Sequence, residues 1–191
     1  VMTDANFNFA RIIHCIGDSM TTFNGSTFSN AKITYSQFLG SNFDNTIFLN
    51  SHLINVVLTG SRMRRSKLKN SIWRHVEGYS LDMSLSEANN SYIGAWSDLR
   101  ESRLDRSKFQ FAKFEQANLS EVSFFNAYLS KALFIDSDLS GADFSSSILQ
   151  DAKIERCKIE GTIFSGANQS DLKVLNCLGN PIDLRASNEA K

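Results

Sequence analysis

The sequence predicts an all-β fold, a four-sided parallel β-helix, and two observations lead to this prediction. A bulky apolar residue recurs every five residues over most of the 191-residue chain, and a small side chain stands two residues before it. A period of five fits neither an amphipathic helix, with 3.6 residues per turn, nor a strand, whose side chains alternate with a period of two. It fits a square coil in which each unit of five residues forms one side, because the bulky and the small residue then both point inward.

The bulky positions form two runs, over 23–73 and 99–164, and residues 74–97 keep the register only weakly. One residue is inserted near Trp96. The small position holds Ala, Ser, Thr or Cys throughout both runs and the zone between them, with four exceptions: Val56, Val76, Leu81 and Val122. This regularity predicts about seven coils of twenty residues, or a rod about 35 Å long at roughly 4.8 Å per coil.

The bulky residues of successive coils then stack in four columns, one on each face. The first face has Phe23, Phe43, Met63, Met83, Leu104, Phe124, Phe144 and Phe164. The second face has Phe28, Phe48, Leu68, Ala88, Phe109, Leu129 and Leu149. The third face has Ile33, Leu53, Trp73, Ile93, Phe114, Phe134 and Ile154. The fourth face has Phe38, Leu58, Gly78, Leu99, Leu119, Leu139 and Ile159. The small residues Gly78 and Ala88 leave space beside Trp73, and the large Trp73 side chain is expected to make up for their small volume.

We expect one β-helical domain over residues 1–172, with a short loop near 13–22 and the irregular zone at 74–97. Residues 173–191 are expected to form a C-terminal tail. Because a solenoid needs capped ends and this polar tail is no obvious cap, we expect it to link the rod to a further domain of a longer protein.

The composition excludes several classes of function. Lys and Arg number 20, as do Asp and Glu, so the net charge is zero, which argues against bulk electrostatic capture of nucleic acid or of an anionic membrane. The three cysteines lack metal-ligand spacing, and no disulfide framework is indicated. Cys157 occupies a small position and should be buried and inert, whereas Cys15 and Cys177 fall in the irregular ends. No apolar run of about 18 residues predicts a membrane span.

No combination of residues predicts catalysis. His14, His52 and His75 are the only histidines, and none has a motif partner that would make it a base or a ligand. The abundant serines are explained by the inward small position, and no phosphate-binding loop is present. We therefore expect a protein that is not an enzyme and that has no cofactor, no metal and no small-molecule substrate.

Charged and aromatic residues outside the inward positions are the candidates for binding a protein partner. Six cations between residues 62 and 74 form a basic belt over three adjacent faces, which either docks an acidic partner or is simply a solvated charge run. Aromatic residues outside the inward positions are expected to form apolar contact surfaces, and those of the irregular zone either display a recognition bulge or mark a tolerated irregularity. The candidate residues are Arg62, Arg64, Arg65, Lys67, Lys69, Arg74, Tyr79, Tyr92, Trp96, Phe111, Phe125 and Tyr128.

The repeat resembles the pentapeptide-repeat family, whose unit is a small residue, Asp or Asn, Leu or Phe, and two polar residues. This resemblance covers residues 5–172 and implies a right-handed quadrilateral β-helix. The units that carry it most clearly are Ala5-Asn6-Phe7, Ser41-Asn42-Phe43, Ala117-Asn118-Leu119, Ser137-Asp138-Leu139 and Ala142-Asp143-Phe144.

Two functions follow from this resemblance. The first seventy residues are similar to the β-helical region of bacterial type III secreted effectors of the SopA and NleL kind, which implies a substrate- or partner-binding module ahead of a HECT-like ubiquitin-ligase domain. Its location would be the host cytoplasm, or otherwise the bacterial cytoplasm. The alternative is a Qnr-like mimic of duplex DNA that binds gyrase or topoisomerase and confers quinolone resistance. Zero net charge, the basic belt and the lack of an apolar C-terminal helix count against this alternative.

Overall fold

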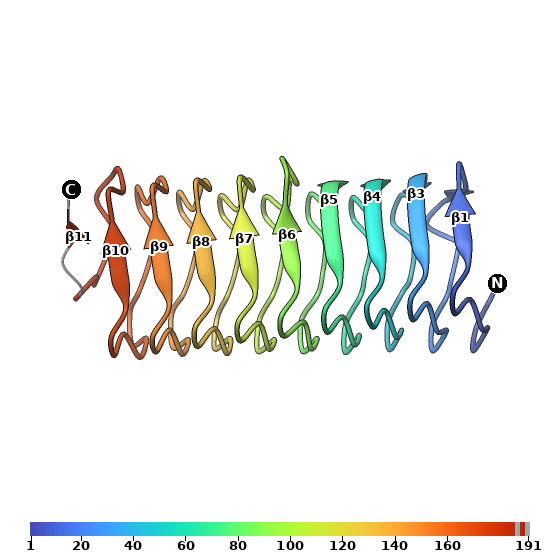
Figure 1. Ribbon diagram of the computed structural model, residues 1–191, viewed down its shortest axis with the longest axis horizontal. Coiled ribbons are helices and arrows are strands. Elements are labelled where there is room, and N and C mark those ends of the chain that lie inside the picture. The colour runs from blue at the N-terminus through green and yellow to red at the C-terminus, as the bar shows by residue number, and fades with distance from the viewer. Residues whose placement is uncertain (186–187, 190–191) are drawn as a thin grey trace.

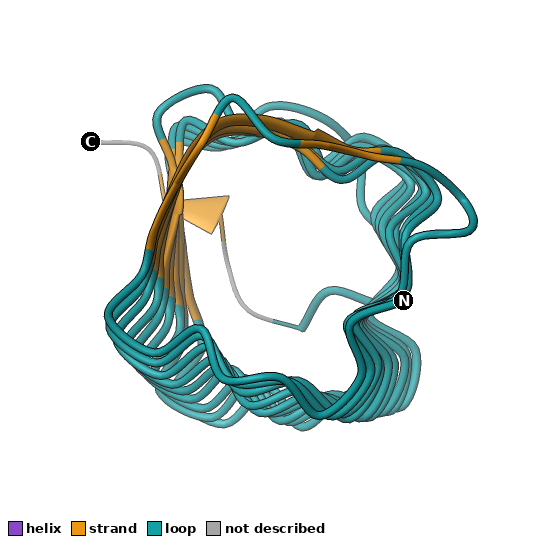
Figure 2. Ribbon diagram, turned by 90° about the vertical axis from the view of Figure 1, so that its right-hand side faces the viewer, coloured by secondary structure: helices purple, strands orange, loops and turns teal. Residues whose placement is uncertain are grey.

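The computed structural model describes residues 1–185 and 188–189 and shows a rod of stacked coils (Figure 1). Viewed along the rod, the chain forms a tube whose strands lie along only part of the wall (Figure 2). Every strand pair is parallel, and strands of successive coils follow one another in the sheet. The structure confirms the predicted parallel β-helix, with about eight turns where seven were expected.

The third face carries most of the strands, and β2 lies on the fourth face, where it pairs with the end of β3. Those of β3 to β5 continue past the corner onto the fourth face, where the β-branched Val56, Val57 and Val76 favour extended backbone, whereas β6 to β10 end before the corner. The strands are β1 (Arg11–Ile13), β2 (Ile16–Gly17), β3 (Lys32–Phe38), β4 (His52–Val57), β5 (Ile72–Glu77), β6 (Tyr92–Gly94), β7 (Lys113–Glu115), β8 (Leu133–Ile135), β9 (Lys153–Glu155), β10 (Lys173–Leu175) and β11 (Asn188–Glu189).

Bulky side chains fill the tube in the predicted columns. The rings of Phe124 and Phe144 lie 4.8 Å apart with their planes within 5°, and Phe144 stacks in turn on Phe164. Inward serines bond to backbone carbonyls, as Ser66 Oγ does to Phe43 O at 2.9 Å, so a polar side chain can be buried without losing its hydrogen bond. The core therefore consists of one ring of stacked side chains per coil.

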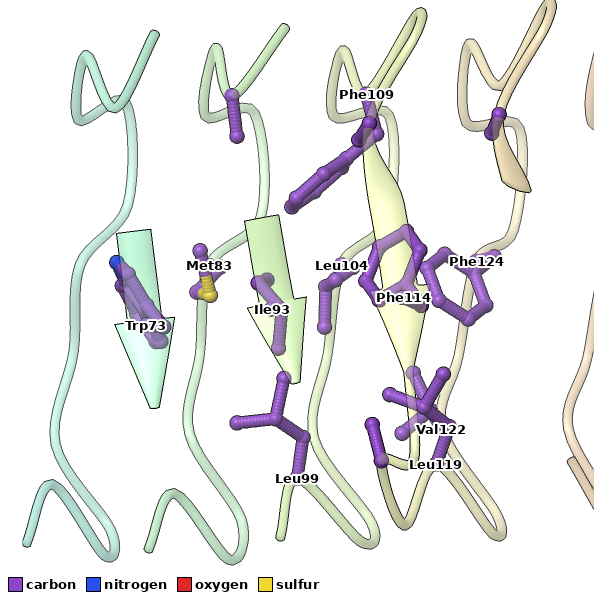
Figure 3. Close-up of a cluster of buried hydrophobic side chains, with 14 of the residues drawn as sticks. Trp73, Met83, Ile93, Leu99, Leu104, Phe109, Phe114, Leu119, Val122 and Phe124 are labelled. Atoms are coloured by element: carbon purple, nitrogen blue, oxygen red, sulfur yellow. The ribbon is translucent and has the colours of Figure 1, made fainter. Parts of the chain in front are cut away.

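The side chains that fill the space at Gly78 differ from the expected Trp73. A Cβ atom at Gly78 would lie 2.6 Å from Leu99 Cδ2 and 3.3 Å from Leu81 Cδ2. The gap left by the missing side chain is therefore filled by Leu99 of the next coil and by Leu81, a bulky exception at a small position. Figure 3 shows the core around this part of the tube, with Trp73 beside Met83 and Ile93.

The two irregular segments each accommodate a single extra residue. Arg74 pairs with Gly94, twenty residues on, but Glu77 pairs with Asp98, twenty-one residues on. The insertion thus lies between 94 and 98, where both Ala95 and Trp96 have positive φ. In the first coil, the segment expected as a loop at 13–22 contains β2 and part of β1, and the extra residue lies in the turn at 18–21.

The coil continues beyond the expected boundary at residue 172. β10 pairs with β9, Leu178 pairs with Lys158, and Ile182 pairs with Ile163. Most of the segment expected as a tail is therefore an additional turn of the rod, because the small and bulky pattern persists there in Cys177 and Val174, both of which are buried.

Candidate partner-binding surface

The neutral composition conceals an uneven distribution of charge over the four faces. Each outward position repeats in the next coil, so residues of one sign can form a column along the rod. On the fourth face seven carboxylates oppose two cations: Asp18, Glu77, Asp98, Glu101, Glu121, Asp138 and Glu160 against Arg100 and Lys158. On the third face seven cations oppose three carboxylates: Arg11, Lys32, Arg74, Lys113, Lys153, Arg156 and Lys173 against Glu115, Asp136 and Glu155. Opposite signs thus dominate two neighbouring faces.

The first face carries an open groove of about 480 Å³ that runs across several coils. Its lining combines cations with apolar side chains. The residues that line it are Arg64, Asp82, Ser84, Leu85, Arg103, Asp105, Arg106 and Phe125. The groove therefore joins one end of the predicted basic belt to one of the predicted aromatic residues, which the sequence had placed in separate patches.

Carboxylates of the same face hold two of the groove's guanidinium groups in place. Arg64 Nη2 lies 2.6 Å from Asp44 Oδ2, and Arg103 Nη2 lies 3.0 Å from Asp105 Oδ2. Arg62 also approaches Asp44, at 3.7 Å, so two cations share one carboxylate and positive charge remains in excess. Burial opposes ionisation of Asp44, but hydrogen bonds from the Arg64 side chain and backbone outweigh it and keep the pKa of Asp44 below its ordinary value.

Apolar side chains at the groove remain accessible. Phe125 is 39% exposed and Leu85 is 43% exposed. An exposed aromatic ring next to arginines is typical of protein interfaces, since both residue types are enriched among the side chains that dominate binding energy. The groove is thus suited to a segment that presents carboxylates and an apolar side chain.

The rest of the basic belt spreads as its register requires. Arg65 lies at the corner after the first face, Lys67 and Lys69 lie on the second face, and Arg74 lies on the third. Glu87 of the next coil sits between Lys67 and Lys108 and binds Lys108 Nζ at 2.8 Å. Half of the predicted belt therefore faces away from the groove.

The aromatic residues of the irregular zone do not form one surface. Tyr79 lies on the fourth face and donates a hydrogen bond to Glu101 Oε2 at 2.7 Å. Tyr92 lies on the third face, where it contacts Glu115 Oε2 at 3.1 Å and where burial, followed by this hydrogen bond, raises its pKa. Trp96, which is 72% exposed, lies at the corner between these faces. The three side chains are therefore spread over two adjacent faces and the corner between them.

Trp96 borders a second open groove of about 450 Å³ at this corner. Its charged lining is internally paired: Arg156 Nε lies 2.7 Å from Asp136 Oδ1, and Lys158 Nζ lies 3.0 Å from Asp138 Oδ2.

The remaining two predicted aromatic residues, Phe111 and Tyr128, lie on and beside the second face. Lys131 Nζ lies 5.5 Å from the centroid of the Phe111 ring. Tyr128, 41% exposed, shares a column with Lys108.

The sequence analysis missed Leu85, Arg103 and Arg106 as groove residues. Their signal was available, because they lie twenty or forty-one residues from belt members and the coil repeat brings such positions together.

Within residues 1–185 and 188–189, no three His, Cys, Asp or Glu side chains gather as a metal site would require. The described part of the chain has no long apolar helix of the kind that crosses a membrane.

Comparisons with known proteins agree with this architecture. Models of pentapeptide repeats match residues 21–48 and 36–72, and a pentapeptide repeat region matches 107–183. A trypsin-treated form of QnrB1, a plasmid-mediated fluoroquinolone resistance protein, is similar with a TM-score of 0.54 and 16% identity over 84% of each chain. Another QnrB1 structure has a TM-score of 0.52 and 18% sequence identity, over 95% of this chain and 91% of that chain.

A third similar structure is HetL, a pentapeptide repeat protein involved in heterocyst differentiation regulation in the cyanobacterium Nostoc, with a TM-score of 0.42 and 16% identity over 94% and 91% of the two chains. No curated protein matches the sequence. At these identities the structural likeness concerns the fold alone.

Proposed function

Because this chain belongs to the pentapeptide-repeat family, we propose that it is a non-enzymatic module that binds an acidic, partly apolar segment of a partner protein. The segment docks in the groove on the first face. The observation that carries this proposal is the combination of Arg64, Arg103 and Arg106 with the exposed Leu85 and Phe125 in one groove. Guanidinium groups already oriented by carboxylates lose little side-chain entropy when a partner carboxylate binds them.

Binding of labelled peptides tests this proposal. Peptides that combine Asp and Glu with Leu and Phe should bind the full chain, and binding should weaken as salt rises. The variant Arg103→Glu/Arg106→Glu should bind these peptides about tenfold more weakly, which corresponds to a loss of about 1.4 kcal/mol in binding free energy. The matched control is Lys153→Glu/Arg156→Glu on the third face, which changes the net charge equally. Equal loss in both variants would show that net charge, not the groove, binds the peptide.

A second candidate function is favoured by the acidic fourth face. Glu77, Asp98, Asn118 and Asp138 follow one another in adjacent coils, so carboxylates recur along the rod at steps of about 4.8 Å or twice that. Such a column could take the place of a phosphate backbone on a DNA-binding enzyme, as the Qnr resemblance implies. Ion pairs neutralise part of this negative charge. Arg100 lies 2.8 Å from Asp98, and Lys158 lies 3.0 Å from Asp138.

A gyrase supercoiling assay with a quinolone separates the two candidates. If the fourth face acts as a DNA mimic, the chain should protect gyrase, and Glu77→Lys/Asp98→Lys should abolish protection while leaving peptide binding in the first-face groove unchanged. If the groove is the functional site, the chain should not protect gyrase at all.

The narrower expectation, a place beside a ubiquitin-ligase domain in a secreted effector, rests on motifs in the first seventy residues and stays a prediction. A reporter fused to this chain would check it by its entry into host cells through a type III secretion system.

A further inference from the structure

Two cysteines stack at the C-terminal end of the rod. Cys157 and Cys177 occupy the same inward small position of the fourth face in adjacent coils. The backbone links these coils directly beside them, since Leu178 N donates to Cys157 O at 2.9 Å. The side chains are 1% and 7% exposed. Cys177 is therefore part of the core, although the sequence analysis placed it in an irregular end.

The two thiols point toward each other. Cys177 Sγ lies 3.6 Å from Ile154 O, which belongs to the coil of Cys157, so this sulfur reaches across the gap between the coils. A hydrogen bond joins the two thiols, and it lowers the pKa of Cys177 to about 7 while raising the pKa of Cys157. The lowered pKa of Cys177 favours its thiolate, the form that attacks disulfides.

The spacing of the coils suits a covalent bond between these positions. Neighbouring coils lie about 4.8 Å apart, and disulfides join residues whose Cα atoms are about 4.4 to 6.8 Å apart. The Cβ atoms must approach to roughly 3.8 Å, which requires the two positions to close by about 1 Å. The last coil can make this adjustment because only one side of it packs against another complete coil.

We propose that Cys157 and Cys177 form a disulfide that fastens the last coil to the preceding one, with a small-molecule disulfide such as oxidised glutathione as the oxidant. The Cys177 thiolate attacks one glutathione sulfur, the glutathione S–S bond breaks, and one glutathione thiolate leaves. Cys157 then loses its proton and attacks the Cys177 sulfur, which expels the second glutathione. The protein loses two protons and two electrons, and the oxidant takes them up to become two molecules of glutathione.

The position of Cys177 makes this reaction accessible. Leu178, the next residue, is 73% exposed, and Gly179 and Asn180 are exposed as well. Local opening of a terminal coil requires far less free energy than global unfolding, so the oxidant can reach Cys177 before Cys157. Once formed, the bond closes a loop of about twenty residues and restricts fraying of the end of the rod.

Peptide mapping after treatment of the full chain with oxidised glutathione tests the proposal. The tryptic peptide 174–185 should be joined to the peptide that contains Cys157, whereas the exposed Cys15 should carry glutathione. The proposal is overturned if Cys177 stays a thiol while Cys15 reacts, or if Cys177 retains glutathione and Cys157 stays a thiol.

Cys157→Ala supplies the matched control. Alanine fills this small position in other coils, for example at Ala117, so the variant should fold. Oxidised wild type should exchange its amide hydrogens over 173–178 about tenfold or more slowly than the reduced protein, and oxidised Cys157→Ala should show no slowing. Equal slowing in both would overturn the role of the bond between the coils.

Discussion

Two blocks of the rod with stacked phenylalanine rings flank a joint that has none. The N-terminal block contains stacked pairs from Phe7 to Phe48, and the C-terminal block contains them from Phe114 to Phe164. In the joint between them the same columns hold side chains of unequal size: Met63, Leu68, Trp73, Gly78, Met83, Ala88 and Ile93. The extra residue between 94 and 98 falls at the end of this joint.

The joint is also where buried polar groups lack partners. Among the described residues, six buried side-chain atoms have no hydrogen bond, and four belong to Ser71, Trp73, Ser86 and Ser91. An unsatisfied buried group costs about 1–3 kcal/mol. The contrast teaches that a coil tolerates an insertion and irregular volumes where its stacking is already weakest, and that the regular blocks on either side stabilise the rod.

The largest expected effect is in the C-terminal block. Phe124→Ala should lower the free energy of unfolding by about 3–5 kcal/mol, because it removes a fully buried ring that stacks on Phe144 and leaves a cavity. Urea denaturation followed by circular dichroism measures this. Phe125→Ala, one residue further on, removes a partly exposed ring and should cost less than about 1 kcal/mol; equal losses would contradict the inward stack.

A smaller effect is expected where the joint is tightly packed. Gly78→Ala should destabilise the protein by about 1–3 kcal/mol, because the new Cβ would lie 2.6 Å from Leu99 Cδ2. Adding Leu99→Val, which shortens the side chain by one methylene group, should recover part of this loss. A double-mutant cycle from thermal or urea unfolding tests the coupling, and simple additivity would show that Leu99 does not fill the gap.

Two serines in one column of small positions differ in whether they bond to the neighbouring coil: Ser66 is joined to the N-terminal block, and Ser86 lies deeper in the joint. Ser66 Oγ bonds to Phe43 O at 2.9 Å, whereas Ser86 Oγ, one coil later, has no partner. Ser66→Ala should cost about 1 kcal/mol, and Ser86→Ala should be neutral or stabilising. The same unfolding measurement on both variants decides; an equal loss would mean that Ser86 does make a hydrogen bond.

The smallest effect concerns pH. Because the pKa of folded Asp44 is lowered, its ionisation contributes stability above the unfolded pKa, and this contribution disappears as the pH falls through the folded pKa. We expect Asp44→Asn to cost about 0.5 kcal/mol at pH 7, since Arg64 is partly exposed to solvent, and less at pH 2. Unfolding curves at both pH values measure this, and a loss that persists undiminished at pH 2 would point to packing.

The repeat allowed much of this structure to be predicted. The five-residue period identified the four faces and the inward residues of 23–164, because a side chain of the wrong size would break a column only one residue wide. The boundary at residue 172 was too early, since the last coil keeps the small and bulky pattern with Val174 and Cys177 after the clearer motifs have ended. Sequence order alone did not reveal that Trp96 stands apart from Tyr79 and Tyr92.

The candidate surface depended more heavily on the three-dimensional arrangement. Local composition identified Arg64 and Phe125 as exposed, but only the stacking of coils brought them into one groove with Arg103 and Arg106. The same holds for the opposite charges of the third and fourth faces and for the contact between Cys157 and Cys177. The linear pattern specifies which side chains point inward because burial acts on each unit of five separately. Which outward side chains become neighbours depends on the exact number of residues in every turn, and a single insertion shifts all later positions relative to the earlier ones.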